Sequence, residues 1–400
     1  MLPAPRPRTL LVTLTGHDRP GVTSALFEAL VRHRVEVVDL DQVVIHGQLV
    51  LAVALGGVRD EPAVRKALVA AADALDMQLE VHPGDEAAPP RRGRSHVTVL
   101  ARSLTPASIA SIAGRIADLG ANIDRIVRIA HYPVTAVELL VSGIAPARLR
   151  ESLSALAAAT GVDVAVQPAG LLRRAKRLVV MDVDSTLVQG EVIEMLAEHA
   201  GCAERVAELT AAAMRGELDF AAALRERVAL FAGLDAAALD AVRREVRLAP
   251  GARTLVRTLK RLDHKVGIVS GGFTQVTDTL VAELGLDFAA ANTLEVVDGR
   301  LTGRLVGPIV DRVGKAAALE RFARQAGVPL GQTVAIGDGA NDLDMLALAG
   351  LGVAFNAKPI VRQAADTSVS APYLDSVLFL LGITREEIEA ADAADGLVTT

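Results

Sequence analysis

The stretch LVVMDVDST, residues 178–186, decides the fold of the C-terminal half of the chain. Its first four residues are apolar, and Asp182 and Asp184 follow directly after them. A short apolar run that ends in a polar turn is typical of a buried strand in a parallel sheet. Two carboxylates at the end of such a strand suit chemistry in which one attacks and the other transfers protons.

Strand patterns recur further along the chain, at residues 265–270, 333–337 and 352–355. Helical stretches separate them, and this alternation predicts a parallel sheet with helices on both faces. Because ligands bind beyond the carboxyl ends of parallel strands, we expect Asp182, Ser270 and Asp338 to converge on one edge. An almost wholly helical insertion, at about residues 188–248, predicts a cap over that edge.

These residues suit the hydrolysis of a phosphate ester. The ester is dianionic and repels a carboxylate nucleophile, so a cation is needed at the same place. Asp182 and Asp338 offer the oxygen ligands that Mg²⁺ prefers, and Lys315 adds a second positive charge. The Ser270 hydroxyl and the Gly271 amide can donate hydrogen bonds to phosphate oxygens. Each residue alone is commonly a turn or cap residue, but together they predict phosphoryl transfer through an aspartyl phosphate.

In combination these motifs resemble the haloacid dehalogenase superfamily, over residues 178 to about 375. DVDST, Ser270, Lys315 and GDGAND (residues 337–342) correspond to its four motifs. The resemblance implies that Asp182 is the nucleophile and that Asp184 first protonates the leaving oxygen and then activates water. It also implies that Asp182, the backbone carbonyl of Asp184 and Asp338 bind Mg²⁺. Asp184 favours a phosphatase, because dehalogenation needs no acid for the leaving group.

Two further residues belong to the same motif: by resemblance Asn341 lies near the phosphate, and Asp342 orients the metal waters or Lys315. The insertion resembles the cap of phosphoserine phosphatases. That resemblance implies that Glu191 pairs with the substrate ammonium, that Arg227 binds its carboxylate, and that Met214 and Phe220 shield the site. A guanidinium fork fits a carboxylate and a glutamate fits an amine. Helices rich in Glu and Arg also commonly display them to solvent.

The expected reaction is therefore Mg²⁺-dependent hydrolysis of O-phospho-L-serine to L-serine and phosphate, the last step of serine biosynthesis. Phosphothreonine and homoserine phosphate remain alternative substrates. A chain that is chiefly an amino-acid sensor, with a vestigial catalytic half, remains an alternative of another class. The complete set of motif residues counts against it.

The N-terminal half contains a βαββαβ pattern twice, at residues 1–85 and 95–170, joined by a segment rich in Gly, Pro and charge. These units resemble ACT domains, which implies amino-acid sensing and a homodimer. Asp18 and Gly21, in the turn before the first helix, form a candidate effector site for serine or another amino acid. An N-cap or turn role for Asp18 is the alternative. The second copy has LTPA (residues 104–107) at this place and lacks both residues.

The expected fold class is thus α/β: a Rossmann-like haloacid dehalogenase core with a helical cap, at residues 171–400, preceded by two ferredoxin-like ACT domains. Net charge is −6 and aromatic content 2%, so nucleic acid is not an expected partner. A single cysteine, Cys202, suits a reducing compartment. We find neither an export signal nor a membrane-spanning stretch, and we expect a cytoplasmic protein.

Overall fold

The computed structural model describes residues 8–84, 93–214 and 217–397. The chain divides into two compact units, Met1–Pro90 and Arg91–Thr400. Among the described residues, no helix is both long and apolar enough to span a bilayer.

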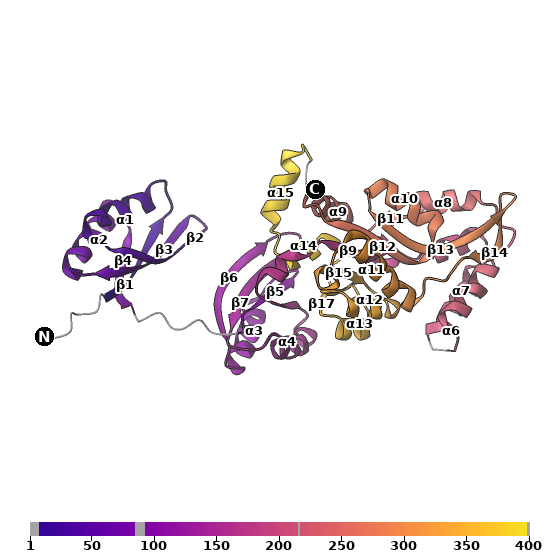
Figure 1. The fold of residues 1–400 in the computed structure, drawn as a ribbon, viewed down its shortest axis with the longest axis horizontal. Coiled ribbons are helices and arrows are strands. Elements are labelled where there is room, and N and C mark those ends of the chain that lie inside the picture. Colours follow the sequence, from indigo (N-terminus) through magenta and orange to yellow (C-terminus); the bar gives the residue numbers. More distant parts are fainter. Residues whose placement is uncertain (1–7, 85–92, 215–216, 398–400) are drawn as a thin grey trace. The chain divides into compact units, whose positions relative to one another are not determined.

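The first unit is a four-stranded antiparallel sheet, in the order β2-β3-β1-β4, with two helices against one face (Figure 1). Alternate residues of β3 are buried, so the sheet presents one apolar face to the helices. The elements are β1 (Arg8–His17), α1 (Val22–Leu30), β2 (Glu36–Ile45), β3 (Gln48–Val58), α2 (Glu61–Ala74) and β4 (Gln78–Gly84). The predicted βαββαβ order is confirmed.

The second unit begins with another sheet of the same topology, in the order β6-β7-β5-β8. Its elements are β5 (Ser95–Ala101), α3 (Pro106–Asp118), β6 (Asn122–Ala130), β7 (Thr135–Ser142), α4 (Pro146–Thr160) and β8 (Asp163–Pro168). This sheet is packed against the rest of the unit. The buried Asp163 accepts hydrogen bonds from the Ser370 amide at 2.6 Å and from the Ser368 hydroxyl at 2.9 Å. Gln167 donates to the Leu380 carbonyl at 2.7 Å.

The C-terminal part is built on a seven-stranded sheet in the order β14-β13-β12-β9-β15-β16-β17 (Figure 1). The predicted strand β9 (Leu178–Asp182) is central, and all five of its residues are buried. Its parallel neighbours are β12 (Lys265–Phe273) and β15 (Thr333–Gly337), followed by β16 (Gly352–Phe355) and β17 (Thr367–Val369). The antiparallel hairpin β13 (Phe288–Val297) and β14 (Arg300–Val306) lies beyond β12.

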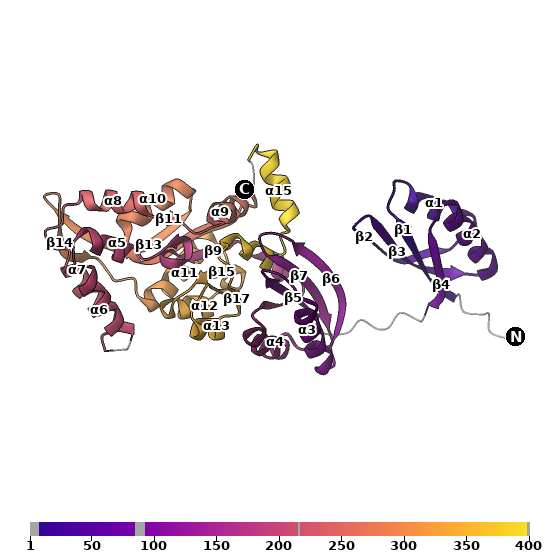
Figure 2. The same ribbon diagram turned by 180° about the vertical axis from the view of Figure 1, so that it is seen from behind.

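Helices cover both faces of this sheet, as Figures 1 and 2 show from opposite sides. They are α9 (Ala252–Arg261), α10 (Thr274–Leu284), α11 (Arg312–Ala326), α12 (Leu343–Leu348), α13 (Pro359–Ala364) and α14 (Val377–Leu380). The last helix, α15 (Arg385–Ala394), instead contacts β6. The expected α/β fold class is confirmed. The hairpin and β17 were not predicted, because the three alanines that follow Phe288 in β13 favour a helix and β17 has only three residues.

The insertion after β9 is helical, as predicted. It contains α5 (Val192–His199), α6 (Ala203–Met214), α7 (Phe220–Ala229) and α8 (Ala237–Glu245). A short antiparallel ladder, β10 (Val188–Gln189) with β11 (Arg247–Leu248), joins the start of the insertion to its end. The insertion shares an apolar cluster with the core, in which Phe231 packs near Phe273 and Val276. The cap is therefore closed at its base and packed against the core.

Candidate active site

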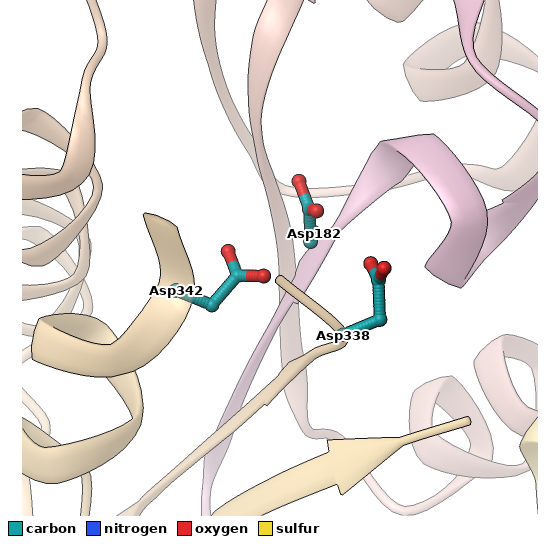
Figure 3. Close-up of side chains that lie close together, drawn as sticks. All are labelled: Asp182, Asp338 and Asp342. Atoms are coloured by element: carbon teal, nitrogen blue, oxygen red, sulfur yellow. The ribbon is translucent and has the colours of Figure 1, made fainter. Parts of the chain in front are cut away.

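Three aspartates from different elements meet at the carboxyl end of the parallel sheet. Asp182 ends β9, Asp338 follows β15, and Asp342 closes the turn η5 (Ala340–Asp342). One carboxylate oxygen of each lies within 4.8 Å of the others, and Figure 3 shows the side chains pointing toward one another. Gly337 permits this approach, because a Cβ there would lie 2.5 Å from the Asp342 Cγ. The topology thus concentrates negative charge at the predicted edge.

Lys315 on α11 partly balances this charge. It is 1% exposed, and its Nζ donates to Asp182 Oδ1 and to Asp342 Oδ1, each at 2.7 Å. Burial alone would lower the pKa of Lys315, but the two carboxylates outweigh burial and raise the pKa. The ammonium therefore stays charged and fixes Asp182 against Asp342. Burial, with the neighbouring Asp342, raises the pKa of Asp182.

The same carboxylates fit a divalent cation. Lys315 occupies one oxygen of Asp182, and the Thr186 hydroxyl donates to one oxygen of Asp338 at 3.0 Å. Asp182 and Asp338 each keep a second oxygen for a metal, whereas both oxygens of Asp342 accept hydrogen bonds, from Lys315 and from the Gly339 amide. Burial and the nearby Asp342 raise the pKa of Asp338 to about 6, against the attraction of Lys315. Hard oxygen ligands in this number are those that Mg²⁺ prefers.

Asp184 lies beside this cluster in the irregular turn η3 (Val183–Leu187). Its Oδ1 accepts from the Val192 amide at 2.8 Å and its Oδ2 from the Ser270 hydroxyl at 2.9 Å. The Gly272 amide in turn donates to the Ser270 Oγ at 2.7 Å. Two motifs separated by 86 residues are therefore connected directly, and a carboxyl group with proton-transfer chemistry is held at the site.

The cap closes over this edge at Phe220. Asp219 caps α7 by accepting from the amides of Ala221 and Ala222, which fixes the position of Phe220 at the first turn. The ring of Phe220 lies above Gly271, where a Cβ would come within 3.1 Å of the ring. Phe220 is thus brought to the site, whereas the side chain of Met214 lies outside the described part of the structure.

Glu191 stands at the start of α5, between the cap and the core. Its carboxylate accepts a hydrogen bond from the Ser185 hydroxyl at 2.9 Å. Burial, followed by repulsion from Asp184, raises the pKa of Glu191 to about 7. Glu191 is partly buried and forms no ion pair within the described part of the chain, an arrangement that favours binding of an amine.

Arg227 on α7 is the complementary group. It is 9% exposed; its Nη1 donates to the Thr210 hydroxyl and its Nε to the Ala223 carbonyl, each at 3.2 Å. Burial lowers the pKa of Arg227, against the attraction of Glu191. No carboxylate forms an ion pair with Arg227 among the described residues, so the guanidinium keeps donors for a ligand.

Asn292 on β13 was missed by the sequence analysis. It is 1% exposed; its Nδ2 donates to the Gly271 carbonyl and its Oδ1 accepts from the Val310 amide, each at 2.8 Å. Asn292 thereby ties the Ser270–Gly271 turn to the segment that leads into α11. No sequence signal could have found it, because the strand that carries it was not predicted.

Asn341 is brought to the site. Asn341 lies in η5 between Asp338 and Asp342, with its Oδ1 close above Gly339.

In the first unit, the N-cap of α1 is Gly21, at φ 94°, and no side chain caps the helix. Of the two alternative roles for Asp18, N-cap or turn residue, the N-cap role is wrong, because the N-cap of α1 lies three residues later. Asp18 lies in an exposed turn, where its amide donates to the Gly47 carbonyl.

Comparisons with known proteins agree with this architecture. Residues 179–347 match the model for haloacid dehalogenase-like hydrolases, and residues 8–82 and 94–167 match models for ACT domains. A phosphoserine phosphatase from Streptomyces coelicolor is 62% identical over 97% of this chain and 96% of its own length. The chain belongs to the phosphoserine phosphatase family.

Other members of the phosphoserine phosphatase family support this assignment. A phosphoserine phosphatase from Mycobacterium tuberculosis is 54% identical over 97% of this chain and 96% of its own. The unliganded structure of a probable phosphoserine phosphatase from Vibrio cholerae has a TM-score of 0.57, with 36% identity over 75% of this chain and 88% of that one. The family resemblance therefore extends beyond the catalytic half.

Proposed function

We propose that this chain hydrolyses O-phospho-L-serine to L-serine and phosphate through an aspartyl phosphate on Asp182. The observation that carries the proposal is the position of Asp182, buried at the end of β9 between Lys315 and two further carboxylates. A carboxylate held there faces the edge where substrates of open α/β sheets bind. The complete catalytic edge also argues against a purely sensing protein.

In the first step an oxygen of Asp182 attacks phosphorus, and the bond between phosphorus and the serine oxygen breaks. Asp184 gives its proton to that oxygen, which leaves as the serine hydroxyl. In the second step Asp184 takes a proton from water, which attacks phosphorus and releases phosphate from Asp182. Bound to Asp182, Asp338 and the Asp184 carbonyl, Mg²⁺ would supply charge that screens the repulsion between substrate and nucleophile. Lys315 holds Asp182 in place. Asn341, in η5 between Asp338 and Asp342, would contact the phosphate.

Specificity for phosphoserine rests on Glu191 and Arg227. A zwitterionic substrate would place its ammonium at Glu191 and its carboxylate at Arg227, neither of which forms an ion pair among the described residues. Arg227→Ala should lower kcat/KM for phosphoserine and spare a phosphate ester that lacks a carboxylate. Equal losses for both substrates would remove Arg227 from carboxylate recognition.

The test of the mechanism is transfer of phosphate to the protein. Rapid-quench experiments with labelled phosphoserine and Mg²⁺ should place the label on the peptide that contains Asp182. Asp182→Asn should abolish both labelling and phosphate release. Asp344→Asn is a matched control, because Asp344 is exposed on α12 and pairs with Arg312. Near-normal turnover of Asp182→Asn would refute the mechanism.

For the N-terminal unit we infer an amino-acid effector site at Asp18 and Gly21 and a homodimer formed through the ACT units. The support for the dimer is β2, an edge strand whose ten residues are all exposed. Val38, Leu40 and Val43 are among them, and an apolar edge of this kind favours pairing with a second copy. Val43→Lys should give a monomer in light scattering, whereas an unchanged mass would exclude this edge. We also infer a cytoplasmic location.

A further inference from the structure

A second concave site lies at the base of the cap. Its volume is about 280 Å³, and its lining shares no residue with the active site. One wall is formed by the last helix of the cap, α8, and by the strand β11, through which the chain returns to the core. The other wall is formed by α10 and the first turn of α9. In both Figure 1 and Figure 2, α8 lies beside α10. The site is therefore shared between the cap and the core.

Four of the lining residues are apolar. Val276 and Leu280, on α10, are 2% and 3% exposed and belong to the apolar clusters that hold the cap and the sheet together. Val246 and Leu248, on either side of Arg247, are half-buried. Because these side chains are anchored in the interior, the apolar part of the pocket is preformed. Pockets for small molecules commonly combine such apolar surface with a few polar groups that orient the ligand.

The polar groups of this pocket are mainly arginines. Arg243, on α8, pairs with Asp240. Arg253, on α9, pairs with Glu283, which also lines the pocket. The side chain of Arg247, on β11, has neither a hydrogen bond nor an ion pair among the described residues. Three guanidinium groups around one pocket repel one another, so an anion bound between them is stabilised.

The arginines keep donors for such an anion. A guanidinium has five N–H donors, and a single carboxylate partner leaves some of those of Arg243 and Arg253 unused. Phosphate and phosphonate oxygens accept hydrogen bonds in pairs from the planar fork of arginine. The lining has three arginines and one carboxylate, in a chain whose net charge is −6, so the excess of positive charge is local. This excess favours a dianion over a monoanion.

We propose that this pocket binds a small organic dianion, a phosphate monoester or phosphonate with an apolar body. Its charged group lies at Arg247, with Arg243 and Arg253 on either side, and its apolar body lies against Val276 and Leu280. Because the walls belong to the cap and to the core, the bound dianion connects the two beside the β10–β11 ladder. The site uses none of the catalytic residues, so it does not depend on the proposed reaction.

Phenylphosphonate is a suitable probe, because it joins a dianion to an apolar ring and has no ester bond to hydrolyse. The full-length chain is titrated with it by calorimetry, in a chelator and at low salt. Arg247→Gln should weaken binding about three- to tenfold, the loss expected for one charge-assisted interaction at an exposed side chain. Exposed charges are screened by salt, so the affinity should also fall as salt is added.

Arg244→Gln is the matched control. Arg244 is exposed at the end of the same helix as Arg243, does not line the pocket and forms no ion pair among the described residues. Its replacement removes the same charge and should leave binding unchanged. Neither Arg244 nor Arg247 lies in the active site, so phenylphosphonate bound there contributes equally to both variants. Equal affinities in the two variants, or no binding by Arg244→Gln, refute the site.

Two further probes test the class of ligand. Benzoate keeps the ring but carries one charge, and inorganic phosphate keeps the charge but has no apolar body. Both should bind more weakly than phenylphosphonate, and equal or tighter binding of either one overturns the assignment.

Amide hydrogen exchange then places the ligand in the fold. Phenylphosphonate should slow exchange in β11 and α10 of Arg244→Gln and not in Arg247→Gln. Slower exchange confined to the catalytic edge in both variants would place the probe in the active site and contradict the proposal.

Discussion

The raised pKa of Glu191 should make the stability of the protein depend on pH. Its pKa rises from 4.5 to about 7 through burial and the nearby Asp184. At about 1.4 kcal/mol for each pH unit, that rise corresponds to roughly 3 kcal/mol of destabilisation once the carboxyl group is ionised. Between pH 4.5 and about 7 the folded protein holds this proton and the unfolded chain has lost it. Raising the pH through this window therefore lowers the free energy of unfolding.

Glu191→Gln isolates the effect, because a glutamine Oε1 can still accept the hydrogen bond from Ser185. Denaturant unfolding is followed in metal-free wild type and variant across this range, using the transition of the phosphatase core. The variant should match the wild type near pH 4.5 and be more stable by about 2–3 kcal/mol at about pH 8. A stability difference that does not change with pH would refute the argument.

Other perturbations should act on the same site. Asn292→Ala leaves the Gly271 carbonyl and the Val310 amide unpaired, so it should cost about 2–4 kcal/mol of stability and lower kcat. Denaturant unfolding and rate measurements check both effects. The control Asn122→Ala, at an exposed position, should change neither the stability nor kcat. Chelation should abolish phosphate release, and Mg²⁺ should restore it and raise the Tm of the wild type more than that of Asp338→Asn. Thr210→Val removes the hydrogen bond that orients Arg227 and should raise KM for phosphoserine severalfold with little change in kcat; an equal loss in kcat would contradict a binding role. Phosphothreonine should be hydrolysed with a kcat/KM only about 10- to 200-fold lower than phosphoserine, measured by competition.

The sequence was informative wherever one short segment carries the whole signal. The apolar run 178–181 and the carboxylates after it predicted both β9 and the catalytic edge, because buried parallel strands are continuously apolar and end at the ligand site. The strand β13 was not predicted, because its first residues, FAAAN, have no strand pattern and are held in the sheet by pairing with β12. The roles of Asn292 and Thr210 could not be predicted either, because they depend on contacts that form on folding. Their partners lie 17 to 21 residues away and come together only after folding.

Charge and shape have separate roles in this site. In the proposed reaction Glu191 and Arg227 would select for any phosphorylated α-amino acid, because a substrate that lacks either charge would forgo one of these two interactions. They would not distinguish serine from threonine, which carry the same charges in the same places. That distinction would depend on Phe220, whose ring lies close to Gly271 and limits the space beside the Ser270–Gly271 turn. Packing against one extra methyl group costs less free energy than leaving a charge unpaired. The cap would therefore discriminate strongly between phosphorylated amino acids and other phosphate esters, and only weakly between phosphoserine and phosphothreonine.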